Sequence, residues 1–256
     1  MGRAVEAHNL YVSYNGTPAL DNVSITVDQG EFLSVLGPNG SGKTTLIKAL
    51  TGIIKDIKGE VLLFNRPLWW YRRRDFARFI SFLPQNPPVT LPFMVKDIVL
   101  MGRFPYLKRF QLERPHDNEA CEHAMELMGI THLAHRHLME LSGGEIKRVF
   151  IAQAIAQESN ILFLDEPTAN LDINYQIEIF KMLKKFNEEM NKTIVLITHD
   201  INHAARFTRR IILLKNGQIV RTGDASRVIN RKDLKFVFGT DIRIEYDRQK
   251  KPYILI

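Results

Sequence analysis

The sequence predicts an α/β fold with an open, mostly parallel sheet, and three observations support that prediction. Short apolar runs that suit buried strands alternate along the chain with segments of helical periodicity. Some of these runs are continuous, as in parallel strands that are covered on both faces. Between the alternating parts, residues 94–158 are rich in Leu, Met, Ala and Glu at helical spacing. This pattern is typical of a parallel sheet with helices on its faces, interrupted by a helical subdomain.

The first part of the chain is predicted to form strands and turns. Residues 5–14 alternate loosely between apolar and polar, and Asn15 with Gly16 marks the turn that follows. Residues 32–36 are apolar except for Ser34, which indicates a strand buried on both faces. The expected strands here are 5–14, 23–27, 32–36 and 61–64, with a helix at 44–50.

The alternation of strand and helix returns beyond the insert. The clearest helices of the insert are expected at 119–128 and 145–157, and the strands beyond it at 161–164, 193–197 and 211–214. An apolar helical stripe is formed by Tyr175, Ile179, Met182, Leu183, Phe186 and Met190. We therefore expect one domain over 1–256, with a core and β subdomain in 1–91 and 154–256 and a helical subdomain in 92–153.

The composition excludes several classes of protein. Of the 256 residues, 45% are hydrophobic and 25% charged, as in soluble globular proteins and unlike disordered ones. No apolar stretch approaches the roughly 20 residues of a membrane helix, and the charge-free run 79–95 is expected to be loop-rich because of its prolines. The single Cys121 allows no internal disulfide. The net charge of +7 fits nucleic acid, an anionic membrane surface or a phosphate-bearing ligand.

The strongest motif lies between the predicted strand 32–36 and the predicted helix 44–50. Residues 37–44 match the phosphate-binding pattern G-x-x-x-x-G-K-[ST] in full. Its glycines let backbone N–H groups curl around phosphates at a helix N-terminus, where anions are favoured. Lys43 is expected to contact the β- and γ-phosphates, and Thr44 to ligate Mg²⁺. A chance glycine turn is the alternative, and the flanking strand and helix argue against it. The expected nucleotide-binding residues here are Gly37, Pro38, Asn39, Gly40, Ser41, Gly42, Lys43, Thr44 and Thr45.

Two carboxylates follow the predicted strand 161–164. Asp165 and Glu166 are expected at the carboxyl edge of a central strand, where open α/β sheets bind their ligands. Asp165 fits the aspartate that holds Mg²⁺ together with Thr44, and Glu166 can polarise an attacking water. Taken alone, the two acids could cap an ordinary helix. The phosphate loop favours the catalytic interpretation.

Residues 141–145, Leu-Ser-Gly-Gly-Glu, stand directly before the second helix expected in the insert. Ser142 suits an N-cap, and the two glycines permit the close approach of another group. These residues predict a helix start that favours an anion, without indicating which molecule supplies it.

Together these motifs resemble the ATP-binding subunit of ABC transporters, across nearly the whole chain and in the family's order. Residues 141–145 resemble the signature Leu-Ser-Gly-Gly-Gln, with Glu145 in place of glutamine. Residues 169–172 resemble the D-loop, usually Ser-Ala-Leu-Asp, with Asn170 as a departure. The resemblance implies a P-loop NTPase (RecA-like) core with a mostly parallel sheet, an N-terminal antiparallel β subdomain and an inserted α-helical subdomain. It also implies that the chain binds ATP and Mg²⁺ and hydrolyses ATP.

The resemblance assigns further site residues. Gln85 falls at the Q-loop glutamine, which senses Mg²⁺ and touches the membrane partner, and Tyr14 matches the aromatic that stacks on adenine. His199 matches the histidine that contacts the γ-phosphate. In this family two subunits meet head to tail, so part of each site comes from the other copy. The residues that would reach the other copy's ATP are Ser142, Gly143, Gly144, Glu145 and Asp172.

A narrower resemblance points to importers of iron chelates, haem and cobalamin. It rests on Leu-Pro-Phe at 91–93, on Leu-Pro-Gln at 83–85 and on residues 97–106, which include Gly-Arg-Phe-Pro-Tyr. Importers of molybdate and other metal complexes share this pattern. In the family, the stretch lies in the helical insert that faces the membrane subunits.

The resulting hypothesis is an ATP-hydrolysing subunit that energises a metal-chelate importer. The residues assigned to catalysis are Lys43, Gln85, Glu166 and His199, and those assigned to Mg²⁺ are Thr44, Gln85 and Asp165. The expected partners are a second copy of the chain, transmembrane permease subunits and, indirectly, a substrate-binding protein, with no nucleic acid. The expected location is peripheral, on the cytoplasmic face of the inner membrane, and cargo specificity would lie on other chains.

The alternative is a soluble ABC-type ATPase that acts on ribosomes or DNA. The net charge of +7 and the run Trp-Trp-Tyr-Arg-Arg-Arg at 69–74 motivate it. Against it, such proteins usually carry tandem ATPase units or long coiled-coil inserts. His132, His135 and His137 suggest zinc at first sight, but no cysteine or carboxylate cluster completes a ligand set, so they are interpreted as surface or packing residues.

Overall fold

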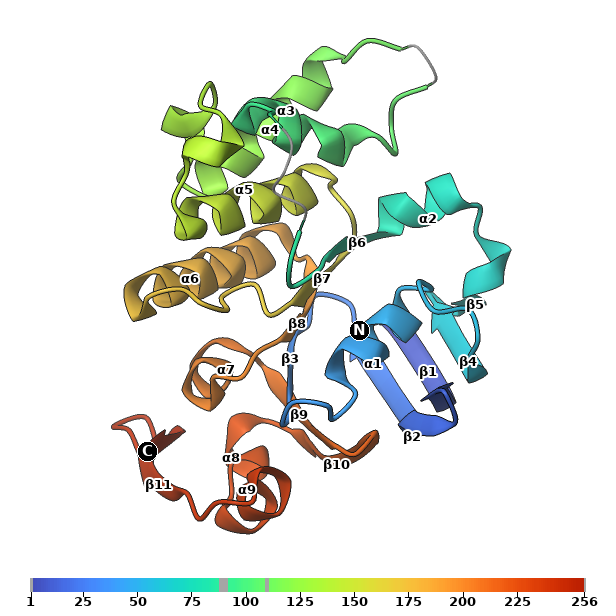
Figure 1. Ribbon diagram of the computed structural model, residues 1–256, viewed down its shortest axis with the longest axis vertical. Helices are drawn as coiled ribbons and strands as arrows, with labels where there is room; N and C mark the ends of the chain where they lie inside the picture. The colour runs from blue at the N-terminus through green and yellow to red at the C-terminus, as the bar shows by residue number, and fades with distance from the viewer. Residues whose placement is uncertain (1, 88–91, 109–110, 256) are drawn as a thin grey trace. The chain divides into compact units, whose positions relative to one another are not determined.

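The computed structural model describes residues 2–87, 92–108 and 111–255 (Figure 1). The chain forms two compact units, which are described separately: unit 1 is Met1–Trp70 with Asn191–Ile256, and unit 2 is Tyr71–Met190. The phosphate-loop motif falls in unit 1, whereas the two carboxylates and the signature motif fall in unit 2. Leu91 of the Leu-Pro-Phe motif lies outside the described residues.

The N-terminal part of unit 1 is an antiparallel sheet, as the resemblance implies. Its strands are β1 (Arg3–Tyr14), β2 (Thr17–Asp28), β4 (Lys58–Leu63) and β5 (Arg66–Pro67), in the order β2-β1-β4-β5. The hairpin between β1 and β2 turns at Asn15 and Gly16, whose φ angles are 50° and 81°. A two-residue hairpin turn requires these left-handed angles, which Asn and Gly adopt at little cost.

The second sheet of unit 1 carries the phosphate loop. Its strands are β3 (Phe32–Leu36), β8 (Thr193–Ile197), β9 (Arg210–Lys215) and β10 (Gln218–Gly223), in the order β10-β9-β3-β8. β3 is parallel to both β8 and β9, and β10 is antiparallel to β9. All residues of β3 and β8 are buried, which explains why they form continuous apolar runs. The helices of this unit are α1 (Lys43–Leu50), α7 (Ile201–Phe207), α8 (Ala225–Val228) and α9 (Arg231–Phe238).

The C-terminal residues of unit 1 form a hairpin that completes its core. Its strands are β11 (Arg243–Tyr246) and β12 (Pro252–Leu255). Ile254 joins the buried cluster that contains Leu36 and Ile201. The Asn202 side chain holds this strand, because it accepts a hydrogen bond from the Ile254 N–H at 2.7 Å and donates one to its carbonyl at 3.1 Å.

Unit 2 combines two parallel strands with a group of helices (Figure 1). The strands are β6 (Ile80–Leu83) and β7 (Ile161–Asp165), and the helices are α2 (Arg73–Phe79), α3 (Val95–Leu100), α4 (Pro115–Leu127), α5 (Gly143–Ala156) and α6 (Ile173–Met190). Short 3-10 segments lie at Leu68–Trp70 in unit 1 and at Met101–Arg103, Thr131–Leu133 and Leu138–Glu140 in unit 2. α5 packs against both α3 and α4. The parallel strands and helices agree with the predicted fold class.

Several predicted boundaries differ from the structure. α4 begins at Pro115, four residues before the expected start, because proline suits the first helical position. The segment 79–95, expected to be loop-rich, contains the strand β6. In the predicted stripe of α6, Tyr175 and Met190 are exposed, whereas Ile179 is buried. Among the residues that the structure describes, no helix has both the length and the apolar character needed to cross a bilayer.

Candidate functional site

The phosphate loop of unit 1 is folded around its own lysine. Lys43 is buried, and its Nζ donates hydrogen bonds to the carbonyls of Gly37 and Pro38, both at 2.9 Å. Gly42, the residue before α1, has a φ of 101°, and a Cβ there would lie 2.3 Å from the Ala19 carbonyl oxygen. The loop therefore needs glycine at this position for two reasons, its left-handed backbone and its contact with β2.

A turn far along the chain supports the same loop. The Gly217 N–H, between β9 and β10, donates to the Ser41 carbonyl at 2.9 Å, and the Gly217 carbonyl accepts from Asp21 N–H at 2.9 Å. The Gln218 side chain also donates to the Asp21 carboxylate at 2.7 Å. These supporting residues were not predicted, because no local pattern links them to the phosphate loop.

His199 leaves the sheet of unit 1 at the same edge as the phosphate loop. β3 and β8 are parallel, with Val35 opposite Ile197, so their carboxyl ends lie next to each other. The Thr198 N–H donates to the Val35 carbonyl at 3.3 Å, and Asp200 caps α7. His199 stands between these two anchored residues and is exposed. The predicted placement of a ligand site at this edge agrees with the rule for open α/β sheets.

Tyr14 is the last residue of β1 in unit 1. It pairs with Thr17 across the hairpin, and its side chain is 50% exposed. Half of its surface is therefore accessible to solvent.

In unit 2, the structure brings Gln85 and Glu166 into direct contact. β6 and β7 are parallel with Leu83 opposite Leu164, so the residues that follow them emerge side by side. The Gln85 Nε2 donates to the Glu166 Oε2 at 2.7 Å. Each of these two residues matches a motif of the sequence, whereas their contact with each other was not predicted.

Asp165 and Glu166 occupy different environments although they are adjacent. Asp165 is the last residue of β7 and is 2% exposed. Glu166 follows the strand with a φ of 49°, in the left-handed region that a residue with a Cβ rarely adopts. This conformation turns the chain sharply after the strand, and the Ala169 N–H donates to the Glu166 carbonyl at 3.1 Å.

Lys147, on α5, contacts Gln85 and was not predicted as a site residue. Its Nζ donates a hydrogen bond to the Gln85 carbonyl at 2.5 Å. Burial lowers the pKa of the Lys147 ammonium, and the negative charges of Glu166 and Asp165 oppose that shift. The helix α5, which begins at the signature motif, is thus connected through Lys147 to Gln85, the residue that contacts Glu166.

The signature motif forms a capping box at the start of α5. The Ser142 hydroxyl accepts a hydrogen bond from the Glu145 N–H, and the Glu145 Oε2 accepts one from the Ser142 N–H at 2.8 Å. A capping box takes glutamate or glutamine at this position. The departure of Glu145 from the family glutamine therefore preserves the local structure.

The two glycines of the signature have different surroundings. A Cβ on Gly144 would lie 3.2 Å from the Tyr175 ring on α6, so glycine allows α5 and α6 to approach closely. The Arg148 guanidinium lies 5.4 Å from the centre of the same ring and pairs with Glu178. Apart from its chain neighbours and the nearby backbone of its own helix, no described atom lies within 4 Å of the corresponding Cβ position on Gly143. Gly143 is therefore accessible at the helix start.

The D-loop leads into α6. Asn170 has a φ of 62°, and the Gln176 side chain donates to the Leu171 carbonyl at 2.7 Å. Asp172 is exposed just before the helix, and its carbonyl accepts from the Gln176 N–H at 3.0 Å.

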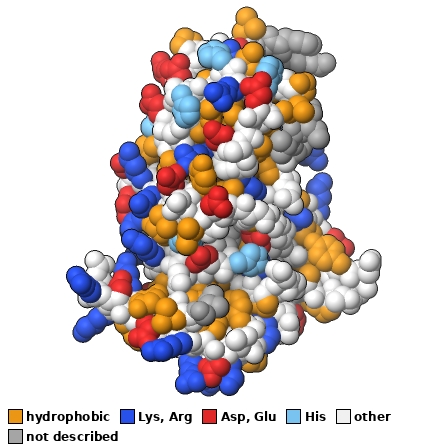
Figure 2. Space-filling model, turned by 60° about the vertical axis from the view of Figure 1, so that its left-hand side comes forward, with side chains coloured by type: hydrophobic (Ala, Val, Ile, Leu, Met, Phe, Trp, Pro, Cys, Tyr) orange, Lys and Arg blue, Asp and Glu red, His pale blue; other side chains and the backbone are white. Residues whose placement is uncertain are grey.

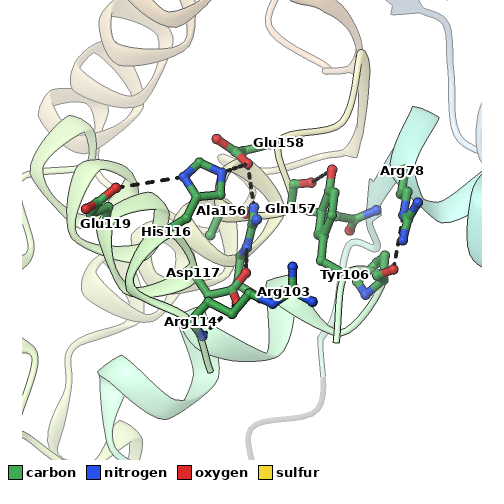
Figure 3. Close-up of polar contacts among 11 residues, drawn as sticks. Arg78, Arg103, Tyr106, Arg114, His116, Asp117, Glu119, Ala156, Gln157 and Glu158 are labelled. Atoms are coloured by element: carbon green, nitrogen blue, oxygen red, sulfur yellow. Dashed lines mark hydrogen bonds and ion pairs between the residues drawn. The ribbon is translucent and has the colours of Figure 1, made fainter. Parts of the chain in front are cut away.

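A buried ionic cluster organises the residues that carry the narrower resemblance (Figure 3). The Arg103 side chain is 1% exposed and donates hydrogen bonds to Asp117 at 2.9 Å and to Glu158 at 2.7 Å. Its guanidinium also lies 4.2 Å from the centre of the Tyr106 ring, whose hydroxyl donates to the Gln157 carbonyl at 3.0 Å. The cluster thus fixes residues 103–106 against the end of α5.

The histidines, Cys121 and the surface charges are the remaining candidate groups. The described residues hold no cluster of three or more His, Cys, Asp or Glu side chains suited to a metal ion. Burial raises the pKa of the Cys121 thiol to about 11, so it stays protonated at neutral pH. Figure 2 shows Lys and Arg side chains interspersed with Asp and Glu on the face that it draws.

Comparisons with known proteins agree with these motifs. A family profile described as ABC transporter matches residues 20–169. The iron(3+)-hydroxamate import ATP-binding protein FhuC of Bacillus subtilis (strain 168) is 35% identical over 98% of this chain and 94% of its own length. The hemin import ATP-binding protein HmuV of Escherichia coli O157:H7 is 36% identical over 95% of each chain. An uncharacterized ABC transporter ATP-binding protein of Bacillus subtilis (strain 168), YvrA, is 36% identical, but this chain spans only 58% of its length.

Solved structures show the same similarity. A chain of an inward-facing ABC transporter assigned to the metal-chelate type has a TM-score of 0.86 and 28% identity, covering 100% of this chain and 97% of that one. A dimeric ATP-binding cassette bound to ADP and Pi in a post-hydrolysis state has a TM-score of 0.75 and 30% identity, covering 86% of this chain and 98% of that one. The chain therefore belongs to the ABC transporter family of ATP-binding proteins.

Proposed function

We propose that this protein is the ATP-binding and ATP-hydrolysing subunit of an importer for an iron-siderophore, haem, cobalamin or a related metal chelate. The observation that carries the hydrolytic part is the contact between Gln85 and Glu166 at the ends of two parallel strands. The import part is supported by relatives whose names describe the import of iron-hydroxamate and hemin.

The phosphate loop fits a nucleotide phosphate. Close contacts occupy the space where a side chain would stand on Gly37 or Gly42, so the loop requires glycine at both positions. A glycine-rich backbone of this kind can direct its N–H groups at a phosphate. Lys43 supplies a positive charge from within the loop. We assign phosphate binding to the residues of the loop, Gly37, Pro38, Asn39, Gly40, Ser41, Gly42, Lys43, Thr44 and Thr45, and adenine stacking to Tyr14.

The candidate Mg²⁺ ligands have suitable chemistry. Mg²⁺ prefers oxygen donors, and Thr44, Gln85 and Asp165 offer a hydroxyl, an amide carbonyl and a carboxylate. Bound Mg²⁺ would neutralise phosphate charge. These assignments rest on the chemistry of the side chains and on the family motifs that they match.

Catalysis is assigned to residues that orient water and stabilise charge. Glu166 would accept the proton of the attacking water, and the Gln85 amide holds one of its carboxylate oxygens. Lys43 and His199 would stabilise negative charge on the transferred phosphoryl group.

A second copy of the chain would complete each site. Gly143 has open space at the start of α5, and the N-terminus of a helix favours an anion. A solved neighbour of this chain is a dimeric cassette. We assign contacts with the ATP of the other copy to Ser142, Gly143, Gly144, Glu145 and Asp172.

The helical subdomain 92–153 is the proposed contact with the transmembrane permease subunits. Phe104 is 63% exposed, although the preceding Arg103 is fully buried and fixes the backbone (Figure 3). An exposed aromatic on a rigid support is typical of a protein contact. The protein would therefore be peripheral, held at the cytoplasmic face of the inner membrane by the permease, with a substrate-binding protein acting indirectly.

The test is the substitution Glu166→Gln in the full chain. We expect ATP to bind as in the wild type and to drive dimer formation, while hydrolysis falls by roughly 10²- to 10⁴-fold, the range typical of a general base. Glu188→Gln is the matched control, because Glu188 lies on α6 in an exposed pair with Lys184. Wild-type turnover of the Glu166→Gln protein would refute the assigned role.

The alternative function, action on ribosomes or DNA, receives no support from the comparisons. Purification from solubilised membranes decides between the two. Recovery of transmembrane subunits supports the importer, whereas recovery of ribosomes or DNA supports the alternative.

A further inference from the structure

The Lys147 side chain links α5, the helix that begins with the signature motif, to the groups assigned to hydrolysis. It lies two residues after Glu145 on α5 and is partly buried. Its ammonium donates to the Gln85 carbonyl, 62 residues away in sequence. It is also close enough to Glu166 and Asp165 for their charges to influence its pKa.

Gln85 is therefore held through its backbone carbonyl and through its side-chain NH2 group. Its carbonyl accepts from Lys147, and its side-chain Nε2 donates to Glu166 at 2.7 Å. Gln85 lies beyond β6, which ends at Leu83, so the hydrogen-bond ladder with β7 does not set the orientation of its peptide. The contact with Lys147 supplies that orientation from a different element.

We infer that Lys147 is a positioning residue: it fixes the Gln85 peptide from α5 and thereby orients the Gln85 amide against Glu166. The inference rests on the proposed function, because it assigns Lys147 an effect on the residue that activates water. Lys147 and the signature motif lie on the same helix, α5. A movement of the signature motif would therefore also move the Gln85 amide.

A purely structural role is the competing explanation. A partly buried lysine stem can stabilise a helix simply by packing its methylene groups. Lys147→Met keeps most of that apolar stem and removes the donor. Lys147→Arg keeps both the charge and a donor.

The first experiment measures steady-state ATP hydrolysis by the full chain. We expect Lys147→Met to lower kcat roughly tenfold with KM for ATP within about twofold, because misplaced catalytic groups slow the reaction without weakening binding. Lys147→Arg should keep kcat within about threefold of the wild type. Lys181→Met, an exposed lysine on α6, is the matched control and should leave kcat unchanged.

The second experiment is a double-mutant cycle with Gln85→Ala, which removes the side chain and keeps the carbonyl. If Lys147 acts through the Gln85 amide, Lys147→Met should lower kcat by less than about twofold in the Gln85→Ala background. A purely structural lysine, or one that acts directly on Glu166, would give the full tenfold loss in both backgrounds. That additive result would overturn the inference.

The two proposals fail separately. If Glu166→Gln abolishes hydrolysis but Lys147→Met retains wild-type kcat, the proposed function stands and the role of Lys147 is refuted. If Lys147→Met reduces the folded fraction measured by circular dichroism, Lys147→Gln takes the place of Lys147→Met in the cycle. The glutamine side chain is shorter than that of lysine, so its amide does not reach the Gln85 carbonyl. An additive cycle with Lys147→Gln overturns the inference in the same way.

Discussion

Asn170 shows how a departure from a family pattern can be explained by one backbone angle. Its φ of 62° lies in the left-handed region, where asparagine is favoured over most residues with a Cβ. The family usually places alanine here, which has no polar side chain to support that conformation. In this chain, the asparagine therefore stabilises the turn that leads into α6.

Replacing Asn170 by alanine should destabilise the protein by about 1 kcal/mol, since alanine is strained by about that amount in the left-handed region and lacks the polar side chain with which asparagine offsets the strain. Asn170→Gly should cost much less, because glycine tolerates this angle. Thermal unfolding measures both. Asn174→Ala, in the exposed helical part of α6, is the control and should be neutral or slightly stabilising. Equal losses for Asn170→Ala and Asn170→Gly would exclude the backbone explanation.

The residues proposed for the site match local sequence patterns one at a time, whereas the contacts between them follow no such pattern. Asp165 and Glu166 were predicted because two acids after a buried strand are a local pattern. Lys147 follows no such pattern, since its role depends on a loop residue 62 positions away. The Gly217 contact with Ser41 was missed for the same reason.

At the scale of elements, the capping box explains how α5 tolerates Glu145. Hydrogen bonds from the Ser142 N–H and hydroxyl hold the pKa of the Glu145 carboxyl below its usual value. Because the folded-state pKa is lowered, this contribution to stability is present above the unfolded pKa of about 4.3 and is lost as pH falls through the folded value.

Glu145→Ala should therefore cost about 1 kcal/mol at pH 7, the usual effect of removing a cap. Glu145→Gln should cost less, since glutamine also closes the box. The difference in unfolding free energy between wild type and Glu145→Gln, measured in urea, should shrink as pH falls below about 4. A difference that is constant from pH 7 to pH 3 would contradict the charged cap.

The buried cluster around Arg103 stabilises the helical part of unit 2. Burial raises the pKa of the Asp117 carboxyl, but the hydrogen bonds from the Arg114 N–H and the Arg103 guanidinium outweigh it and lower the pKa. Asp117 thus stabilises the fold above its unfolded pKa of about 3.9, and that contribution is lost as pH falls through the lower folded value.

Arg103→Met should destabilise the protein by about 3–5 kcal/mol, because it leaves a buried carboxylate without its partner. Because the variant starts from a lower stability, acid unfolding should begin at a higher pH than in the wild type, and the stability difference between the two proteins should shrink as Asp117 becomes protonated. Arg73→Met, an exposed arginine on α2, is the control. Circular dichroism during an acid titration measures the shift, and an unchanged acid midpoint would contradict the role of the pair.

Strands were predicted correctly where their residues are uniformly buried. β3 and β8 are buried throughout and appear as continuous apolar runs. β6 was missed because it lies within a proline-rich segment, and β11 and β12 because charged and apolar residues mix there. The latter hairpin depends on Asn202, a tertiary contact that local periodicity does not encode.

For the whole molecule, net charge was the least informative property. The value of +7 admitted nucleic acid and membrane partners equally, and side chains of both signs are interspersed on the surface in Figure 2. An exposed apolar residue on a rigid support is a better indication of where a protein partner binds. Phe104 meets that description, since Arg103 and Tyr106 are anchored on either side of it.

Phe104→Asp should separate ATP hydrolysis from transport. The side chain is 63% exposed, so its replacement should leave stability and the basal ATPase of the isolated chain unchanged, within about 0.5 kcal/mol for unfolding. A charge at an interface that buries an aromatic side chain should greatly reduce the amount of permease that copurifies from solubilised membranes. Phe236→Asp on α9 is the matched control, because Phe236 is 59% exposed and lies in unit 1. If both variants retain the permease equally, the contact lies elsewhere on the protein. If Phe104→Asp alone loses it, the rigid segment around Arg103 is the surface through which ATP hydrolysis is coupled to the membrane subunits.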